Sequence, residues 1–117
     1  MAFLDYSDIA PREIAPGFSA RFVHTPRVTL ARVDVRRDAR LPSHAHPHEQ
    51  LTTVLSGELE LTVAGEVRVL RAGMVAFIPG GVPHSAHALT PCEVLDVFHP
   101  VREDYRDRWE SGASRDG

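Results

Sequence analysis

The chain has 117 residues, of which 43% are hydrophobic and 25% charged, and its formal net charge at pH 7 is -3. That length allows one domain with one hydrophobic core, and the composition is typical of globular proteins. Positive and negative residues are interspersed, which excludes a basic face for nucleic acid or an anionic membrane. No apolar run is long enough to span a bilayer, and residues 1–16 show no secretion signal. The single cysteine, Cys92, excludes an internal disulfide and favours a reducing, cytoplasmic compartment.

The first part of the chain predicts an arm followed by strands. Residues 1–16 contain prolines and little periodicity, so we expect them to form an arm rather than a helix. Residues 18–25 alternate in polarity, and residues 28–35 are rich in β-branched side chains, as in strands. Residues 36–42 are polar and are expected to connect these strands to a stretch rich in histidine.

The second part predicts short strands separated by frequent turns. Regular short strands without a helical period predict an all-β sandwich or barrel built from antiparallel strands. The charged tail is expected to form a short helix over 105–109 and then to be disordered. We therefore expect one domain over 1–117, with a core at about 18–102, an arm at 1–16 and a tail at 103–117. The strands expected here are 51–55, 59–63, 67–69, 75–78 and 92–99.

Residues 44–50 read His-Ala-His-Pro-His-Glu-Gln and carry the strongest functional signal. Residues two apart share a face of a strand, so His44, His46 and Gln50 can converge on one point. Neutral imidazole is the commonest metal-ligand side chain, and an amide oxygen can complete such a set. A second stretch, 73–84, ends an apolar run with His84. The alternative, a cluster of solvated loop histidines, does not account for this second stretch.

These residues resemble the two motifs of the cupin superfamily. The first motif has the form Gly-x5-His-x-His-x3/4-Glu-x6-Gly, and the second Gly-x5-Pro-x-Gly-x2-His-x3-Asn. The chain departs from them at Asp38, Gln50 and Ala88, which stand in place of glycine, glutamate and asparagine. The matching segments are His44-x-His46-x3-Gln50-x6-Gly57 and Gly73-x5-Pro79-x-Gly81-x2-His84.

The resemblance implies a small cupin β-barrel or jelly roll that holds one divalent metal through His44, His46, Gln50 and His84. Three imidazoles and an amide leave the full charge of the metal for an anionic substrate, whereas a glutamate would cancel part of it. This ligand set admits nickel, zinc, manganese, iron or copper. His48 is expected at the rim or as a proton shuttle.

Three further residues near the motifs are expected outside the ligand set. Glu49 should point away from the ligands, in the direction of a partner subunit. His87 should lie behind the ligands or at the surface. We expect no catalytic role for His24 or His99.

A narrower resemblance covers Leu95–Tyr105, which reads Leu-Asp-Val-Phe-His-Pro-Val-Arg-Glu-Asp-Tyr. This segment is similar to one in small cupins of the pectin-degradation type, which open the ring of 4,5-unsaturated uronates. The resemblance implies that Asp96, Phe98 and Arg102 are the catalytic positions.

The residue chemistry leaves alternatives for two of these positions. Asp96 lies on a strand whose faces are largely apolar, so it must be paired, protonated or functional. It could be a proton-transfer group or a structural acid paired with Arg32. Arg102 could hold a substrate carboxylate with its planar fork, or it could be an exposed charge paired with Glu103 or Asp104.

The sequence therefore predicts a metal-binding cupin that acts on a small anionic metabolite. The first hypothesis is linearisation of 4,5-unsaturated uronates with the help of metal-bound water. The alternatives are an iron-dependent dioxygenase and a non-catalytic sensor that binds a metabolite. The arm and the open edges of such short strands favour a homodimer.

Overall fold

The computed structural model describes residues 2–116, with side chains described as far as Trp109. Over this range the chain forms a short 3-10 helix at Tyr6–Asp8, ten strands and one C-terminal α-helix, α1, at Glu103–Asp116. The strands are β1 (Arg12–Ala15), β2 (Phe18–His24), β3 (Thr29–Val35), β4 (Arg40–His44), β5 (Glu49–Ser56), β6 (Leu59–Val63), β7 (Glu66–Leu70), β8 (Val75–Ile78), β9 (His84–Ala88) and β10 (Cys92–His99).

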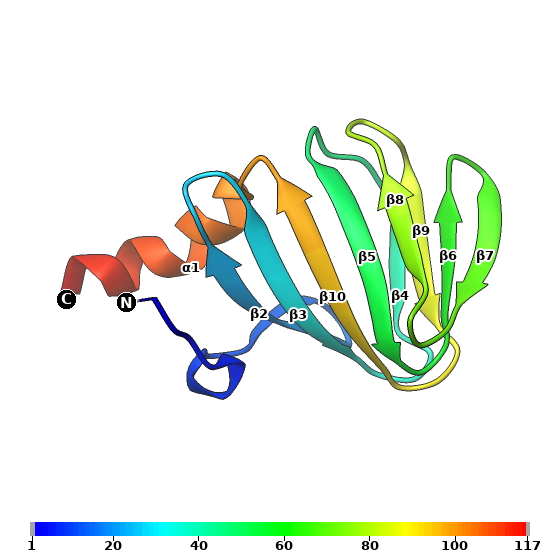
Figure 1. Ribbon diagram of the computed structural model, residues 1–117, viewed down its shortest axis with the longest axis horizontal. Helices are drawn as coiled ribbons and strands as arrows, with labels where there is room; N and C mark the ends of the chain where they lie inside the picture. Colours follow the sequence, from blue (N-terminus) through cyan, green and yellow to red (C-terminus); the bar gives the residue numbers. More distant parts are fainter. Residues whose placement is uncertain (1, 117) are drawn as a thin grey trace.

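The strands form two antiparallel sheets that face each other (Figure 1). The six-stranded sheet has the order β1-β2-β3-β10-β5-β8, and the four-stranded sheet has the order β4-β9-β6-β7. The last strand, β10, lies between β3 and β5, so residues distant in sequence are neighbours at the centre of the larger sheet. This arrangement confirms the all-β jelly roll expected from the sequence.

Alternation along the strands separates an inner from an outer face of each sheet. On β5, Gln50, Thr52 and Val54 are buried, whereas Leu51 and Leu55 are exposed. The core between the sheets is apolar, and each fully buried valine, leucine or isoleucine contributes roughly 1.5–3 kcal/mol. Its buried members are Phe18, Ala20, Ala31, Val33, Val35, Val54, Leu59, Leu61, Leu70, Ile78, Ala88, Cys92, Val94 and Phe98.

Three strands differ from the sequence expectation. β1 lies within the expected arm, where it pairs with β2. β4 begins inside the segment expected to be a connection, and it tolerates Pro42 because it is an edge strand, where a missing N–H leaves no ladder bond unmade. β9 reads His-Ser-Ala-His-Ala and contains no β-branched residue, so its sequence carries little strand signal.

The C-terminal helix is longer than expected. It extends from Glu103 to Asp116, over residues expected to be disordered, and residue 117 lies outside the described range. Its aromatic side chains pack on Phe22 of β2, with ring centroids 4.9 Å from Tyr105 and 5.6 Å from Trp109. Figure 1 shows α1 beyond β2, at the end of the larger sheet. No helix of the described chain is long and apolar enough to cross a membrane.

Candidate metal centre

The predicted ligands come together from the ends of three strands. His44 ends β4, Gln50 is the second residue of β5, and His84 begins β9. His46 lies in the connection between β4 and β5, so His44, His46 and Gln50 do not share one strand as the alternation argument assumed. His44 and His84 are cross-strand partners in the smaller sheet, and their ring centroids are 4.2 Å apart.

Contact between two loops holds His46 beside the other histidines. The N–H of Gly81 donates to the carbonyl oxygen of His46 at 2.7 Å. At Gly80 a Cβ atom would lie only 2.3 Å from the carbonyl oxygen of Pro47, so the close approach requires a residue without a side chain. Gly81 also has a positive φ of +80°, which glycine adopts at little cost. Gly80 and Gly81, in the stretch that carries the second motif, therefore position the loop that carries His46.

Each histidine of the cluster is oriented by a backbone carbonyl. A carbonyl oxygen only accepts hydrogen bonds, so each Nδ1 carries the proton and each Nε2 keeps a free lone pair. The candidate ligand atoms of the three histidines all lie within 4.8 Å of one another. The Nδ1 atom of His44 donates to the carbonyl oxygen of Pro42 at 2.8 Å. In the same way, Nδ1 of His46 donates to the carbonyl oxygen of His48 at 3.1 Å, and Nδ1 of His84 to that of Val82 at 2.9 Å.

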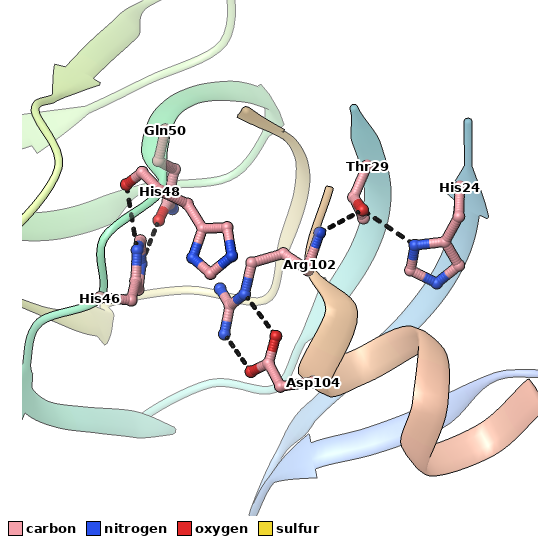
Figure 2. Close-up of polar contacts among 7 residues, drawn as sticks. All are labelled: His24, Thr29, His46, His48, Gln50, Arg102 and Asp104. Carbon is pink, nitrogen blue, oxygen red and sulfur yellow. Dashed lines mark hydrogen bonds and ion pairs between the residues drawn. The ribbon is translucent and has the colours of Figure 1, made fainter. Parts of the chain in front are cut away.

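Two further contacts fit a cation at this point. The Oε1 atom of Gln50 lies 3.1 Å from Nε2 of His46, so two lone pairs face each other (Figure 2). Gln50 presents its oxygen there because its NH₂ group donates to Thr52 Oγ1 at 2.9 Å and to Asp96 Oδ1 at 3.4 Å. Nε2 of His84 is buried without a hydrogen-bond partner. A divalent metal would satisfy all three of these acceptors.

Electrostatics keeps the imidazoles in the form that binds metal. Burial lowers the pKa of His46 to about 4, and the positive charge of Arg102 and the neighbouring His84 add to the effect. Burial also lowers the pKa of His84. Both rings are therefore neutral at pH 7, as a metal ligand must be.

Asp96 lies on the inner face of β10, behind the amide of Gln50. The hydroxyl of Thr52 donates to Oδ1 of Asp96 at 2.7 Å. Burial raises the pKa of Asp96 to about 6, although hydrogen bonds from Thr52 and Gln50 and the charge of Arg102 oppose the shift. Its possible structural partner, Arg32, faces the other side of the sheet and pairs with Glu93, so a buried Asp96–Arg32 pair is not formed.

Arg102 is a buried cation close to the histidine cluster. Its side chain donates to both carboxylate oxygens of Asp104, from Nε at 3.0 Å and from Nη2 at 2.8 Å (Figure 2). The guanidinium carbon lies 4.7 Å from the ring centroid of Phe98 and 4.0 Å from that of Tyr105. The backbone N–H of Arg102 donates to Oγ1 of the buried Thr29 at 2.9 Å. Arg102 is paired with Asp104, as one alternative expected, but it is only 6% exposed.

One cavity of about 60 Å³ lies between these groups. A water needs about 10–15 Å³ of such space, so there is room for an ion and the reacting end of a small ligand. Sequence reasoning missed Thr52 and Tyr105, which also line the cavity. Tyr105 ends the segment Leu95–Tyr105, but nothing in the sequence predicts that it packs on a guanidinium. The predicted site residues that line the cavity are His44, His46, Gln50, His84, Asp96, Phe98 and Arg102.

The other histidines of the motifs lie outside the cluster. His48 turns toward Arg102, and Figure 2 shows its ring between Gln50 and the guanidinium. His87 lies 3.5 Å from Asp38 and does not line the cavity. Glu49 is exposed and points away from the ligands, as expected.

Comparison with known proteins agrees with this geometry. The model of the Cupin domain matches residues 31–98, which include every candidate ligand. The chain belongs to the cupin family. No curated protein matches the sequence.

Solved cupins resemble the chain over most of its length. KdgF from Halomonas sp. is 30% identical with a TM-score of 0.84, and the match covers 90% of this chain and 98% of that one. An RmlC-like cupin from Shewanella frigidimarina is 28% identical with a TM-score of 0.85, over 90% and 96% of the two chains. A protein described as a predicted oxalate decarboxylase from Thermotoga maritima, at 20% identity and a TM-score of 0.75 over 84% and 98%, shares the fold.

Proposed function

We propose that this cupin binds one divalent transition metal through His44, His46, His84 and Gln50 and opens the ring of 4,5-unsaturated uronates. The observation that supports an enzyme is the cavity itself. It brings a donor set for a metal, a buried acid with a pKa near neutrality and a buried guanidinium to one small space. A structural metal site would need neither of the last two groups.

Arg102 is suited to bind the carboxylate of such a substrate. Guanidinium has five N–H donors, and Asp104 accepts hydrogen bonds from its Nε and Nη2 atoms. Stacking between Phe98 and Tyr105 fixes the plane of the guanidinium before any ligand arrives. Its remaining donors can therefore hold the uronate with little loss of side-chain entropy.

Asp96 is suited to move the proton. Ring opening removes the proton of the hemiacetal hydroxyl, breaks the bond between that carbon and the ring oxygen, and delivers a proton to carbon 4 of the enol. The product is an isomer, so no further reactant is needed. A carboxyl group with a pKa of about 6 can take and return this proton at neutral pH. The bound metal would supply a Lewis acid that polarises a substrate oxygen.

The substrate class rests on resemblance as well as on charge. Residues Leu95–Tyr105 are similar to the corresponding segment of cupins of the pectin-degradation type, and Asp96, Phe98 and Arg102 of that segment line the cavity. The similarity to KdgF over 90% of the chain supports a cupin of the same small, single-domain kind.

The test is to incubate the metal-loaded protein with 4,5-unsaturated galacturonate without oxygen and to follow the ring signals by NMR. We expect the ring signals to disappear faster than in buffer and linear keto-acid signals to replace them. Asp96→Asn should lower kcat roughly 10²–10⁴-fold while metal content is retained. Arg102→Lys keeps the charge but loses the fork, so KM should rise at least as much as kcat falls.

Each failure has a distinct meaning. Disappearance no faster than in buffer, with metal bound, contradicts the uronate proposal. Turnover that requires oxygen would identify a dioxygenase instead. Tight binding of a small acid without turnover would identify a sensor.

A further inference from the structure

Thr52 lies between the amide of Gln50 and the carboxylate of Asp96, on the inner face of β5. It is two residues after Gln50, so both side chains point to the same face, and it is the cross-strand partner of Asp96 on β10. The residue is almost fully buried, with 3% of its surface exposed. This position therefore holds a hydroxyl group exactly where a candidate metal ligand meets the buried acid.

The hydroxyl of Thr52 has a single proton, and Asp96 accepts it. A hydroxyl group donates one hydrogen bond and accepts others with its lone pairs. The 2.7 Å between Oγ1 of Thr52 and Oδ1 of Asp96 is typical of a hydrogen bond to a carboxylate, which is stronger than one between neutral groups. Gln50 lies 2.9 Å from the same Oγ1 atom, so Thr52 can only accept a hydrogen bond from it.

This direction determines which end of the amide faces Thr52. Only the NH₂ group of Gln50 can donate to Oγ1, and Oδ1 of Asp96, 3.4 Å from the same nitrogen, is a second acceptor on that side. The oxygen Oε1 must then lie at the other end of the amide. There it faces Nε2 of His46 at 3.1 Å, in the position where a metal would bind both atoms (Figure 2).

The reversed orientation of the amide would block the site. With the amide turned over, the NH₂ group would face Nε2 of His46 and donate a hydrogen bond to the lone pair that a metal needs. The two ends of an amide have nearly the same size and shape, so packing alone does not distinguish the two orientations. The hydrogen-bonding groups around the amide make the choice.

We propose that Thr52 is a positioning residue that holds the Gln50 amide with its oxygen toward the metal. The inference rests on the proposed metal centre but not on the uronate substrate. A carboxylate at position 50 has two equivalent oxygens and needs no such selection. The role of Thr52 therefore belongs to the glutamine that stands in place of the glutamate of the cupin motif.

Titration calorimetry with Ni²⁺ measures the effect on metal affinity. Thr52→Val keeps the shape of the side chain but removes the hydroxyl, so the Kd should rise by about tenfold or more, as for other groups that orient a ligand. Thr52→Ser keeps the hydroxyl and should retain most of the affinity. Thr53→Val is the matched control: Thr53 follows on the same strand but points to the outer face, so its loss should leave the Kd unchanged.

A double-mutant cycle separates orientation from packing. In the Gln50→Glu background, Thr52→Val should change the Kd for Ni²⁺ far less than in the wild type, because either oxygen of the carboxylate can meet the metal. A packing defect would instead weaken both proteins equally. Circular dichroism checks that each variant is folded, and Thr52→Ala, which also lacks the hydroxyl, replaces Thr52→Val should that variant not fold.

NMR of the metal-free protein reads the orientation of the amide without any metal. In the wild type, the NH₂ protons of Gln50 should give stronger NOEs to Thr52 than to the ring of His46, and Thr52→Val should reverse this ratio. Unchanged Ni²⁺ affinity in folded Thr52→Val, or equal losses in the two backgrounds, overturns the proposal, whatever the uronate assay gives. A wild type that binds no Ni²⁺ overturns the metal centre, and an amide that keeps its orientation in Thr52→Val overturns the role of Thr52 itself.

Discussion

The side-chain amide of Gln50 contacts both a candidate metal ligand, His46, and the buried acid, Asp96. The oxygen of Gln50 faces Nε2 of His46, while its NH₂ group faces Thr52 and Asp96. A glutamate at this position would place a second acid beside Asp96 instead of a donor. Glutamine in place of the glutamate of the first cupin motif is therefore consistent with a pKa of Asp96 near neutrality.

Gln50→Glu tests this role. We expect the variant to retain the metal, because a carboxylate oxygen can replace the amide oxygen. Its negative charge should raise the pKa of Asp96 further above about 6. The acidic limb of the pH profile of kcat should therefore move to higher pH, and binding of the anionic substrate should weaken. Unchanged metal affinity together with an unchanged pH profile would show that Gln50 contacts neither partner.

Among the structural elements, the loops and the C-terminal helix were the hardest to foresee. Alternation and turn signals predicted most of the strands, and the motifs together with the Leu95–Tyr105 resemblance named seven of the residues that line the cavity. The sequence could not show how His46 is held beside His84, because its position depends on contact between its loop and two glycines distant in the chain. Nor could it show that Arg102 is buried, because its burial depends on Tyr105 and the packing of α1 on Phe22.

Gly80→Ala tests the contact between the loops. The added Cβ would lie 2.3 Å from the carbonyl oxygen of Pro47, so the loop that carries His46 must shift. We expect metal affinity to fall by about tenfold or more, as happens when the groups that orient a ligand are lost. Gly65→Ala is the control: it has a positive φ but no atom within 4 Å, so it should cost about 1 kcal/mol of stability and leave metal affinity unchanged. Equal metal affinity in the two variants would contradict this role of Gly80.

On the scale of the whole molecule, the inner face of the larger sheet carries residues of the candidate site as well as the hydrophobic core. The inner faces of β5 and β10 supply Gln50 and Asp96 to the cavity, whereas their neighbours Leu51 and Val97 point to the outer face. The inner face also buries titratable groups between the sheets, which links the stability of the whole molecule to pH.

The metal-free protein should be more stable at about pH 7.5 than at about pH 5. The pKa of His46 is lowered from 6.5 to about 4, so the unfolded chain binds the extra proton between these values and stability rises with pH. Burial also lowers the pKa values of His48 and His84, which act in the same direction. Asp96 acts in the opposite direction: its pKa is raised from 3.8 to about 6, so its contribution is lost as pH rises through this range.

Urea denaturation at the two pH values measures this balance. Because three histidines oppose one acid, the midpoint should be higher at the higher pH. Asp96→Asn removes the opposing group, so the difference between the two midpoints should increase. A midpoint that is higher at the lower pH would show that the histidines are not protected from protonation.

The central claim is a single metal centre formed by residues of both motifs, and calorimetric titration of the chelator-treated protein with Ni²⁺ tests it most directly. The geometry predicts one ion per chain in the wild type and binding at least roughly tenfold weaker in folded His84→Ala. His87→Ala is the matched control, because His87 lies beside Asp38, outside the cavity, and its loss should not change the titration. Wild-type affinity in His84→Ala, or no binding to the wild type, would contradict the claim.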